Sequence, residues 1–77
     1  MATITRVSVQ YVERDDQTWA EVSGYVGEAL DGASSFPVVD GDRLSALRLA
    51  WQDFERAFHP PPEACGEVEA ALRAAAN

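Results

Sequence analysis

Residues 3–12 read TITRVSVQYV and residues 18–30 read TWAEVSGYVGEAL, and both runs alternate apolar with polar side chains. A period of two that is rich in Val and Thr predicts half-buried β-strands. Between the two runs, residues 13–17 read ERDDQ and hold an Asp-Asp pair suited to a turn. We therefore expect the runs to form an antiparallel hairpin.

The alternation also assigns a face to each side chain of the second run. The core face is expected to carry Ala20, Val22, Val26 and Leu30, and the outer face Trp19, Glu21, Ser23, Tyr25 and Ala29. The glycines at 24 and 27 predict a bulge or a close approach of another segment. Residues 31–35, DGASS, are expected to form a loop. Phe36–Val39 could add a short third strand, and Pro37 would restrict it to a sheet edge.

Residues 40–59 carry the strongest helical pattern in the chain. Apolar side chains recur at spacings of three and four at Leu44, Leu47, Trp51, Phe54 and Phe58. This spacing predicts an amphipathic helix. Asp40 or Asp42 is suited to its N-cap, and the helix should end near His59, before three prolines.

Strands grouped before helices are typical of an α+β architecture. We expect a β-hairpin or three-stranded antiparallel sheet within 3–39, then the main helix over 40–59 and a short C-terminal helix over 62–75. Both helices should pack on one face of the sheet. The 77 residues leave room for one compact domain, residues 1–77. A core of this size is thin, so homodimerisation is a serious alternative to a free monomer.

Charge is the strongest functional signal. The chain has 13 acidic and six basic residues, and its net charge is −7. Phosphates would repel it, so we expect no direct binding to nucleic acid. No apolar run is long enough to span a membrane, and no membrane partner is expected. The lack of lysine and the 13 alanines are typical of a GC-rich bacterial or phage genome.

The compartment follows from the cysteine count and the start of the chain. A single cysteine, Cys65, allows no disulfide within the chain, and residues 1–6 have no apolar leader segment. Both features favour the cytoplasm, here the cytosol of a bacterial host.

No catalytic residue, cofactor or metal ligand is assigned. His59 and Cys65 are the only histidine and thiol, and we interpret them as a helix-end residue and a small buried side chain. The stretch 40–42, Asp-Gly-Asp, lacks the later ligands of a calcium loop. With 13 acids present, a small carboxylate-using enzyme or a ligand-binding domain remains an alternative.

The leading hypothesis is a non-enzymatic inhibitor that binds a basic nucleic-acid-binding surface of a partner protein or complex. The expected contact residues are Glu13, Asp15, Asp16, Trp19, Glu21 and Tyr25. They combine acidic groups with exposed aromatics, as interface hot spots do. Anti-CRISPR and anti-restriction inhibitors from phages and mobile elements share this size, charge and composition.

A second hypothesis is a homodimeric structural or regulatory accessory protein, such as an antitoxin-like or phage accessory subunit. Its sheet face or edge would then be self-complementary. Leu49, on the far side of the main helix from the apolar stripe, is a further candidate for a contact.

Overall fold

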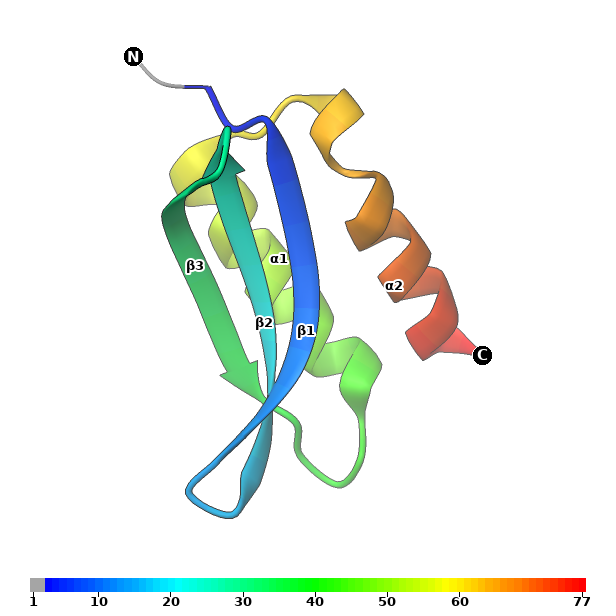
Figure 1. Cartoon of the computed structure of the whole chain (residues 1–77). Helices are drawn as coiled ribbons and strands as arrows, with labels where there is room; N and C mark the ends of the chain where they lie inside the picture. The colour runs from blue at the N-terminus through cyan, green and yellow to red at the C-terminus, as the bar shows by residue number, and fades with distance from the viewer. Residues whose placement is uncertain (1–2) are drawn as a thin grey trace.

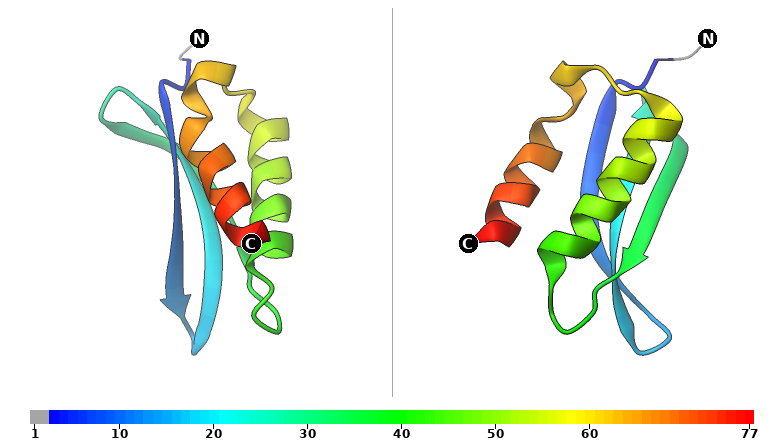
Figure 2. Two further views of the ribbon diagram at one scale, coloured as in Figure 1. Left: turned by 90° about the vertical axis from the view of Figure 1, so that its right-hand side faces the viewer. Right: turned by 180° about the vertical axis from the view of Figure 1, so that it is seen from behind.

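The computed structural model describes residues 3–77 and shows a three-stranded antiparallel sheet followed by two helices (Figure 1). The strands, in the spatial order β1-β2-β3, are β1 (Arg6–Arg14), β2 (Gln17–Val26) and β3 (Ala29–Pro37). The helices are α1 (Arg43–Phe58) and α2 (Gly66–Ala76), separated by a short 3₁₀ turn, η1 (Pro62–Ala64). Both helices lie on one face of the sheet (Figure 2). The predicted α+β architecture is confirmed.

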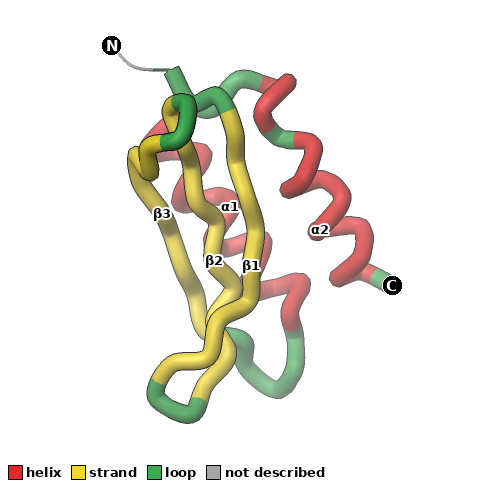
Figure 3. The backbone as a smooth tube through the Cα atoms, in the orientation of Figure 1, coloured by secondary structure: helices red, strands yellow, loops and turns green. Residues whose placement is uncertain are grey.

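The first hairpin forms as expected. β1 and β2 pair from Arg6–Tyr25 to Arg14–Gln17. Asp15 and Asp16 make the two-residue turn, with φ angles of 54° and 62°. Two successive positive φ angles are typical of a type I′ turn, whose twist matches that of the strands. Figure 3 shows the tip of this hairpin extending past the ends of β3 and of both helices.

The course of the chain after β2 differs from the prediction. Residues 18–30 are not one strand, because β2 ends at Val26 and the chain reverses at Gly27, with φ of 62°. Residues 31–35, expected as a loop, lie within β3, and Leu30, expected in the core, is 62% exposed. Across the two-residue turn, Val26 pairs with Ala29 and Tyr25 with Leu30. The turn therefore shifts the alternation by one residue and places Leu30 on the same face as Tyr25.

Pro37 lies on an edge strand, as predicted. The N–H of the following residue, Val38, donates to the carbonyl of Thr18 at 2.8 Å and therefore points toward β2. N–H groups alternate in direction along a strand. An N–H at Pro37 would point away from the sheet, so its absence removes no hydrogen bond from the ladder.

The core lies between the sheet and the two helices. Its fully buried large side chains are Val7, Val22, Leu47, Phe54 and Val68. Two glycines let α1 approach the sheet closely: Gly24 lies under the ring of Phe54, and Gly32 lies under the ring of Phe58. A Cβ at either glycine would collide with the ring. The close approach predicted at Gly24 is therefore confirmed. The register shift beside Gly24 has its extra residue, Asp31, on β3. At Gly27 the prediction was wrong, because the chain turns there and nothing lies within 4 Å of an added Cβ.

The ends of α1 agree with the sequence analysis. The side chain of Asp42 caps the N-terminus and accepts a hydrogen bond from the N–H of Ser45 at 3.1 Å. His59 is the C-cap, with φ of 47°. The second helix begins later than expected, at Gly66, because residues 62–64 first form the separate turn η1.

Candidate interaction surface

The face of the sheet opposite the helices carries three of the six predicted contact residues; we call it the outer face. Trp19, Glu21 and Tyr25 alternate along β2 with Ala20 and Val22, which are fully buried. The three side chains therefore point away from the helices, as predicted. Each is nonetheless half-buried, because neighbouring side chains of the same face partly cover it.

Two arginines of β1 cover the aromatic rings. The guanidinium carbon of Arg6 lies 4.0 Å from the centroid of the Tyr25 ring, and that of Arg14 lies 5.1 Å from the centroid of the Trp19 ring. Such cation–π contacts contribute about 0.5–1 kcal/mol at exposed sites. The aromatic pair that we expected to be free for a partner is thus already engaged within the chain.

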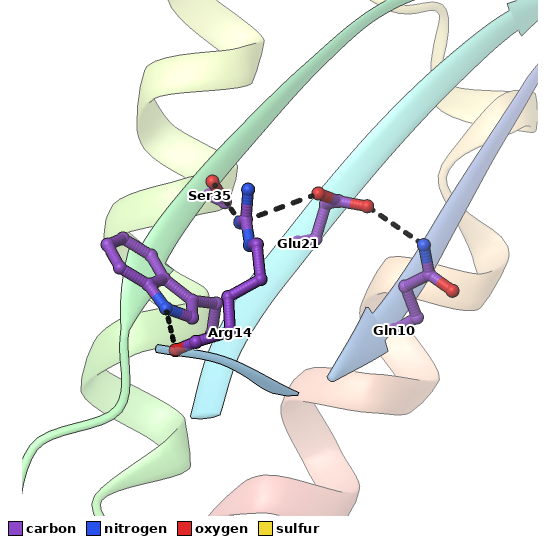
Figure 4. A network of polar contacts seen from close by, with 5 residues as sticks. Gln10, Arg14, Glu21 and Ser35 are labelled. Carbon is purple, nitrogen blue, oxygen red and sulfur yellow. Dashed lines mark hydrogen bonds and ion pairs between the residues drawn. The ribbon is translucent and has the colours of Figure 1, made fainter. Parts of the chain in front are cut away.

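Glu21 is engaged as well (Figure 4). Its carboxylate accepts a hydrogen bond from the amide of Gln10 at 2.8 Å and lies 3.9 Å from the guanidinium of Arg14. Arg14 also donates to the hydroxyl of Ser35 at 3.3 Å, and its carbonyl accepts from the indole N–H of Trp19 at 3.4 Å. One polar network therefore links all three strands, and Glu21 contributes little free negative charge.

The other three predicted contact residues lie at the tip of the first hairpin. Asp15 and Asp16 are exposed in the turn, and Glu13 is exposed just before it. Glu13 accepts a hydrogen bond from the hydroxyl of Thr18 at 2.6 Å. By its position in the alternation of β1, it belongs to the opposite face of the sheet from Trp19. The six predicted residues thus form two groups, one at the tip and one on the outer face.

Two further aspartates lie at the same end of the molecule as the tip. β3 runs antiparallel to β2 and Pro37 pairs with Trp19, so the loop from β3 to α1 lies near the first hairpin turn (Figure 1). This loop carries Asp40 and Asp42, both exposed. We call the combined group the carboxylate end, which consists of Glu13, Asp15, Asp16, Asp40 and Asp42. The sequence alone suggests the last two as helix caps and does not place them beside the tip, because it does not reveal the course of β3.

Three aspartates of the carboxylate end have left-handed backbone conformations. The φ angles are 54° at Asp15, 62° at Asp16 and 55° at Asp40. Glycine adopts such angles without steric penalty, and Asn-Gly is the preferred pair in this type of turn. In residues 3–77, His59 is the one other non-glycine residue with a positive φ. Aspartate at these positions keeps negative charge where glycine would fit the backbone better.

Almost none of the acidic charge is neutralised by an ion pair. Twelve of the thirteen acidic residues are exposed, and Glu21 is the exception. Among the described residues, the pair between Arg14 and Glu21 is the one salt bridge. The negative field of the chain therefore extends into the surrounding solvent.

Cys65 and His59 have the structural surroundings that we expected for them. The Cys65 thiol is buried and donates to the carbonyl of Pro61 at 3.3 Å. Burial raises the pKa of this thiol, and nearby glutamates act in the same direction. A raised pKa disfavours the thiolate, which is the form that attacks an electrophile or binds a metal. His59 caps the C-terminus of α1.

A hollow of about 540 Å³ lies between β1, the start of α1 and the end of α2. One carboxyl group lines it, that of Asp42, and this group is hydrogen-bonded to Ser45 as the helix cap. The hollow thus offers no pair of free carboxylates for acid–base chemistry among the described residues. Residues 3–77 also contain no group of three or more potential metal ligands.

Comparison of the chain with protein-family models, curated proteins and solved structures found no match. No helix in the described part of the chain is both long and apolar enough to cross a membrane. The function is therefore inferred from the surface of the molecule itself.

Proposed function

We propose that this chain is a non-enzymatic protein-binding module whose carboxylate end occupies a basic nucleic-acid-binding surface of a partner protein or complex. The observation that carries the proposal is the exposure of twelve of the thirteen acidic side chains, with one ion pair among the described residues. Like the phosphates of a nucleic acid, these carboxylates attract arginine and lysine side chains. Opposite fields also speed association and set its orientation.

The shape of the carboxylate end supports insertion into a groove. The first hairpin projects beyond the helices, and its turn holds Asp15 and Asp16 (Figure 3). The molecule measures 38 × 26 × 19 Å, so it is narrow enough to approach a cleft end-on. Partner side chains would thus meet these two carboxylates first.

The outer face takes a smaller part in this proposal than in the sequence-based hypothesis. Trp19 lies two residues from the start of β2, next to the tip, and supplies an apolar contact at the margin of the interface. Tyr25 lies at the opposite end of β2, where it pairs with Arg6. Glu21 is held by Gln10 and Arg14. We therefore leave Tyr25 and Glu21 out of the contact set.

The finer form of the proposal is an inhibitor of the anti-CRISPR or anti-restriction type, of phage or mobile-element origin. It would act in the cytosol of a bacterial host by covering the nucleic-acid path of a defence complex. Its support is the combination of small size, a net charge of −7 and the projecting acidic tip.

The test captures partners from a lysate of the native host with the tagged protein. Duplicate washes contain about 0.1 M and about 0.5 M salt, because screening weakens attraction between opposite charges. Captured proteins are identified by mass spectrometry and then challenged with DNA and RNA. The proposal expects a nucleic-acid-binding protein that is lost at high salt and displaced by its nucleic acid. A partner that keeps its nucleic acid while bound would overturn occlusion.

Two variants make the test specific to the carboxylate end. The triple variant Asp15→Asn, Asp16→Asn, Asp40→Asn removes three charges and keeps side chains that tolerate positive φ angles. The matched control, Glu55→Gln, Glu63→Gln, Glu69→Gln, removes three charges elsewhere, from α1, η1 and α2. The first should lose the partner and the second should retain it. Equal loss of partner binding in both variants would show that binding depends on the net charge and not on the carboxylate end.

The homodimeric accessory protein remains the second candidate. One observation favours it: β3 lies at an edge of the sheet.

A further inference from the structure

The two edges of the sheet differ. At the β1 edge, α2 packs alongside the strand, and its Glu67 carboxylate accepts a hydrogen bond from the N–H of Val9 at 2.6 Å. At the β3 edge, the main contacts of the strand are with β2 and with α1 beneath the sheet. Figure 1 shows no described segment beside the outer side of β3. Edge strands left open in this way are templates for pairing with another strand.

The direction of the backbone groups of β3 can be derived from one hydrogen bond. The N–H of Val38 points toward β2, and N–H groups alternate along a strand. Ser34 and Phe36 therefore also direct their backbone groups toward β2. Ala33 and Ser35 direct their N–H and C=O groups toward the open edge. These outward groups are free to pair with a further strand.

The side chains along this edge are small and allow a second strand to approach. Ala33 is exposed, and Ser35 is partly covered by the Arg14 side chain that donates to its hydroxyl. The sheet continues smoothly on this side, because the register shift between β2 and β3 lies at the other end, where Asp31 is the extra, unpaired residue. The open segment is thus regular over residues 32–37.

On the outer face, the charged side chains at this edge are placed to meet opposite charges of a second copy. The Arg14 guanidinium lies between the hydroxyl of Ser35 and the ring of Trp19, and Trp19 pairs with Pro37. The Arg14 side chain is 51% exposed. When two β3 strands run antiparallel with Ala33 opposite Ser35, Asp31 of the second copy, at the register shift just beyond the regular segment, lies near Pro37. The negative carboxylate of one copy then comes next to the guanidinium of the other, and the two-fold axis makes this contact twice.

We propose that β3 pairs antiparallel with β3 of a second copy, with Ala33 opposite Ser35 and with Arg14 of each copy against Asp31 of the other. This register uses the outward N–H and C=O groups of Ala33 and Ser35 in both chains, and it joins the two sheets into one of six strands. Asp31 of each copy lies away from the two-fold axis. The like charges nearest the axis are the two Asp53 carboxylates, each of which accepts a hydrogen bond from the hydroxyl of its own Ser34 at 2.7 Å, and their repulsion opposes the pairing. Leu30, 62% exposed in the single chain, lies beside this contact.

The dimer is independent of the proposed function. The hairpin tips lie outside the β3–β3 contact and point in opposite directions along the joined sheet, so each carboxylate end stays free. A dimer that binds no basic partner would leave this inference intact, and a monomer that binds one would overturn this inference alone.

Sedimentation velocity over a range of concentrations, up to about 1 mM to detect weak association, tests the proposal on the full chain. The wild type should shift from monomer to dimer. Asp31→Arg should weaken dimerisation about tenfold, because two attractions become repulsions. Glu28→Arg is the matched control: it makes the same charge change at an exposed turn residue just before β3, and it should dimerise like the wild type. A wild type that stays monomeric throughout overturns the proposal.

Two further measurements separate the interface from general effects on the fold. The double variant Asp31→Arg, Arg14→Asp exchanges the two charges and should restore dimerisation relative to Asp31→Arg, with circular dichroism to verify folding. Hydrogen exchange of the wild type should show protection at the Ala33 and Ser35 amides that increases with protein concentration. Exchange at these two amides that is fast and independent of concentration would contradict the proposed pairing, however strongly the variants dimerise.

Discussion

The carboxylate of Glu67 in α2 accepts a hydrogen bond from the backbone N–H of Val9 in β1 at 2.6 Å, across 58 positions of sequence. β1 is an edge strand, and the bond to the helix shows that this N–H points away from β2, where no strand offers it a partner. The helix side chain satisfies it and helps to close that edge. The same contact ties α2 to the sheet at the point where the two lie side by side (Figure 2).

Glu67→Ala should lower the free energy of unfolding by about 1 kcal/mol, because the Val9 N–H loses its acceptor. Glu69→Ala is the control, since it removes the same charge from the same first turn of α2 and leaves the bond to Val9 in place. Urea denaturation measures both. Equal losses would mean that the helix dipole accounts for the effect and that the hydrogen bond contributes nothing.

Gly24→Ala should destabilise the fold by about 1–3 kcal/mol, as overpacking of a dense core does. The added Cβ would collide with the ring of Phe54, so α1 would have to move away from the sheet. At Gly66 nothing lies within 4 Å of an added Cβ, and Gly66→Ala should be neutral or stabilising. Thermal unfolding compares them, and a Gly24→Ala variant as stable as the wild type would refute this packing of α1 on β2.

Asp42 should make part of the stability depend on pH. Hydrogen bonds from the hydroxyl and then the N–H of Ser45 lower the pKa of its carboxyl group. A folded pKa below the unfolded one means that this stabilisation is present above the unfolded pKa and is lost as pH falls through the folded pKa. At neutral pH, Asp42→Ala should therefore melt a few degrees below the wild type, and this gap should close in strong acid.

Asp42→Asn serves as the control for that titration. Asparagine also caps helix N-termini, but it does not ionise. The difference in melting temperature between Asp42→Asn and Asp42→Ala should persist in acid. The difference between the wild type and Asp42→Ala should disappear there. A gap between wild type and Asp42→Ala that is the same at every pH would contradict the assigned role of the carboxylate.

The Cys65 thiol should react slowly with a disulfide reagent at neutral pH. Burial first, and nearby carboxylates second, raise its pKa and disfavour the thiolate. Unfolding in denaturant should accelerate the reaction at least about tenfold, and so should raising the pH of the native protein by one or two units, as long as it stays folded. Rapid labelling of the native protein at neutral pH would contradict this burial.

Local periodicity was enough to predict the order of strands and helices and the outward direction of Trp19 and Tyr25. It was not enough to reveal the reversal at Gly27, because Leu30 continues the apolar spacing of Val22 and Val26 in the sequence although the turn places it on the opposite face. The position of Asp40 beside the tip depends on that reversal and was therefore missed.

The covering of the aromatic rings was missed for a related reason. Arg6 stacks on Tyr25 because the two residues are direct partners in the register of β1 and β2. Each residue is visible in its own alternating run, but their contact depends on the pairing between runs. The sequence therefore predicts an aromatic outer face and does not show that arginines occupy it.

The most direct test of the proposed function is the salt dependence of the association rate between the purified chain and its captured partner. If the carboxylate end drives encounter, the rate should fall steeply as salt rises and shortens the screening length to below about 8 Å. Asp15→Asn, Asp16→Asn, Asp40→Asn should abolish most of that dependence, and Glu55→Gln, Glu63→Gln, Glu69→Gln should preserve it. An association rate that changes neither with salt nor in the first variant would contradict recognition by the carboxylate end.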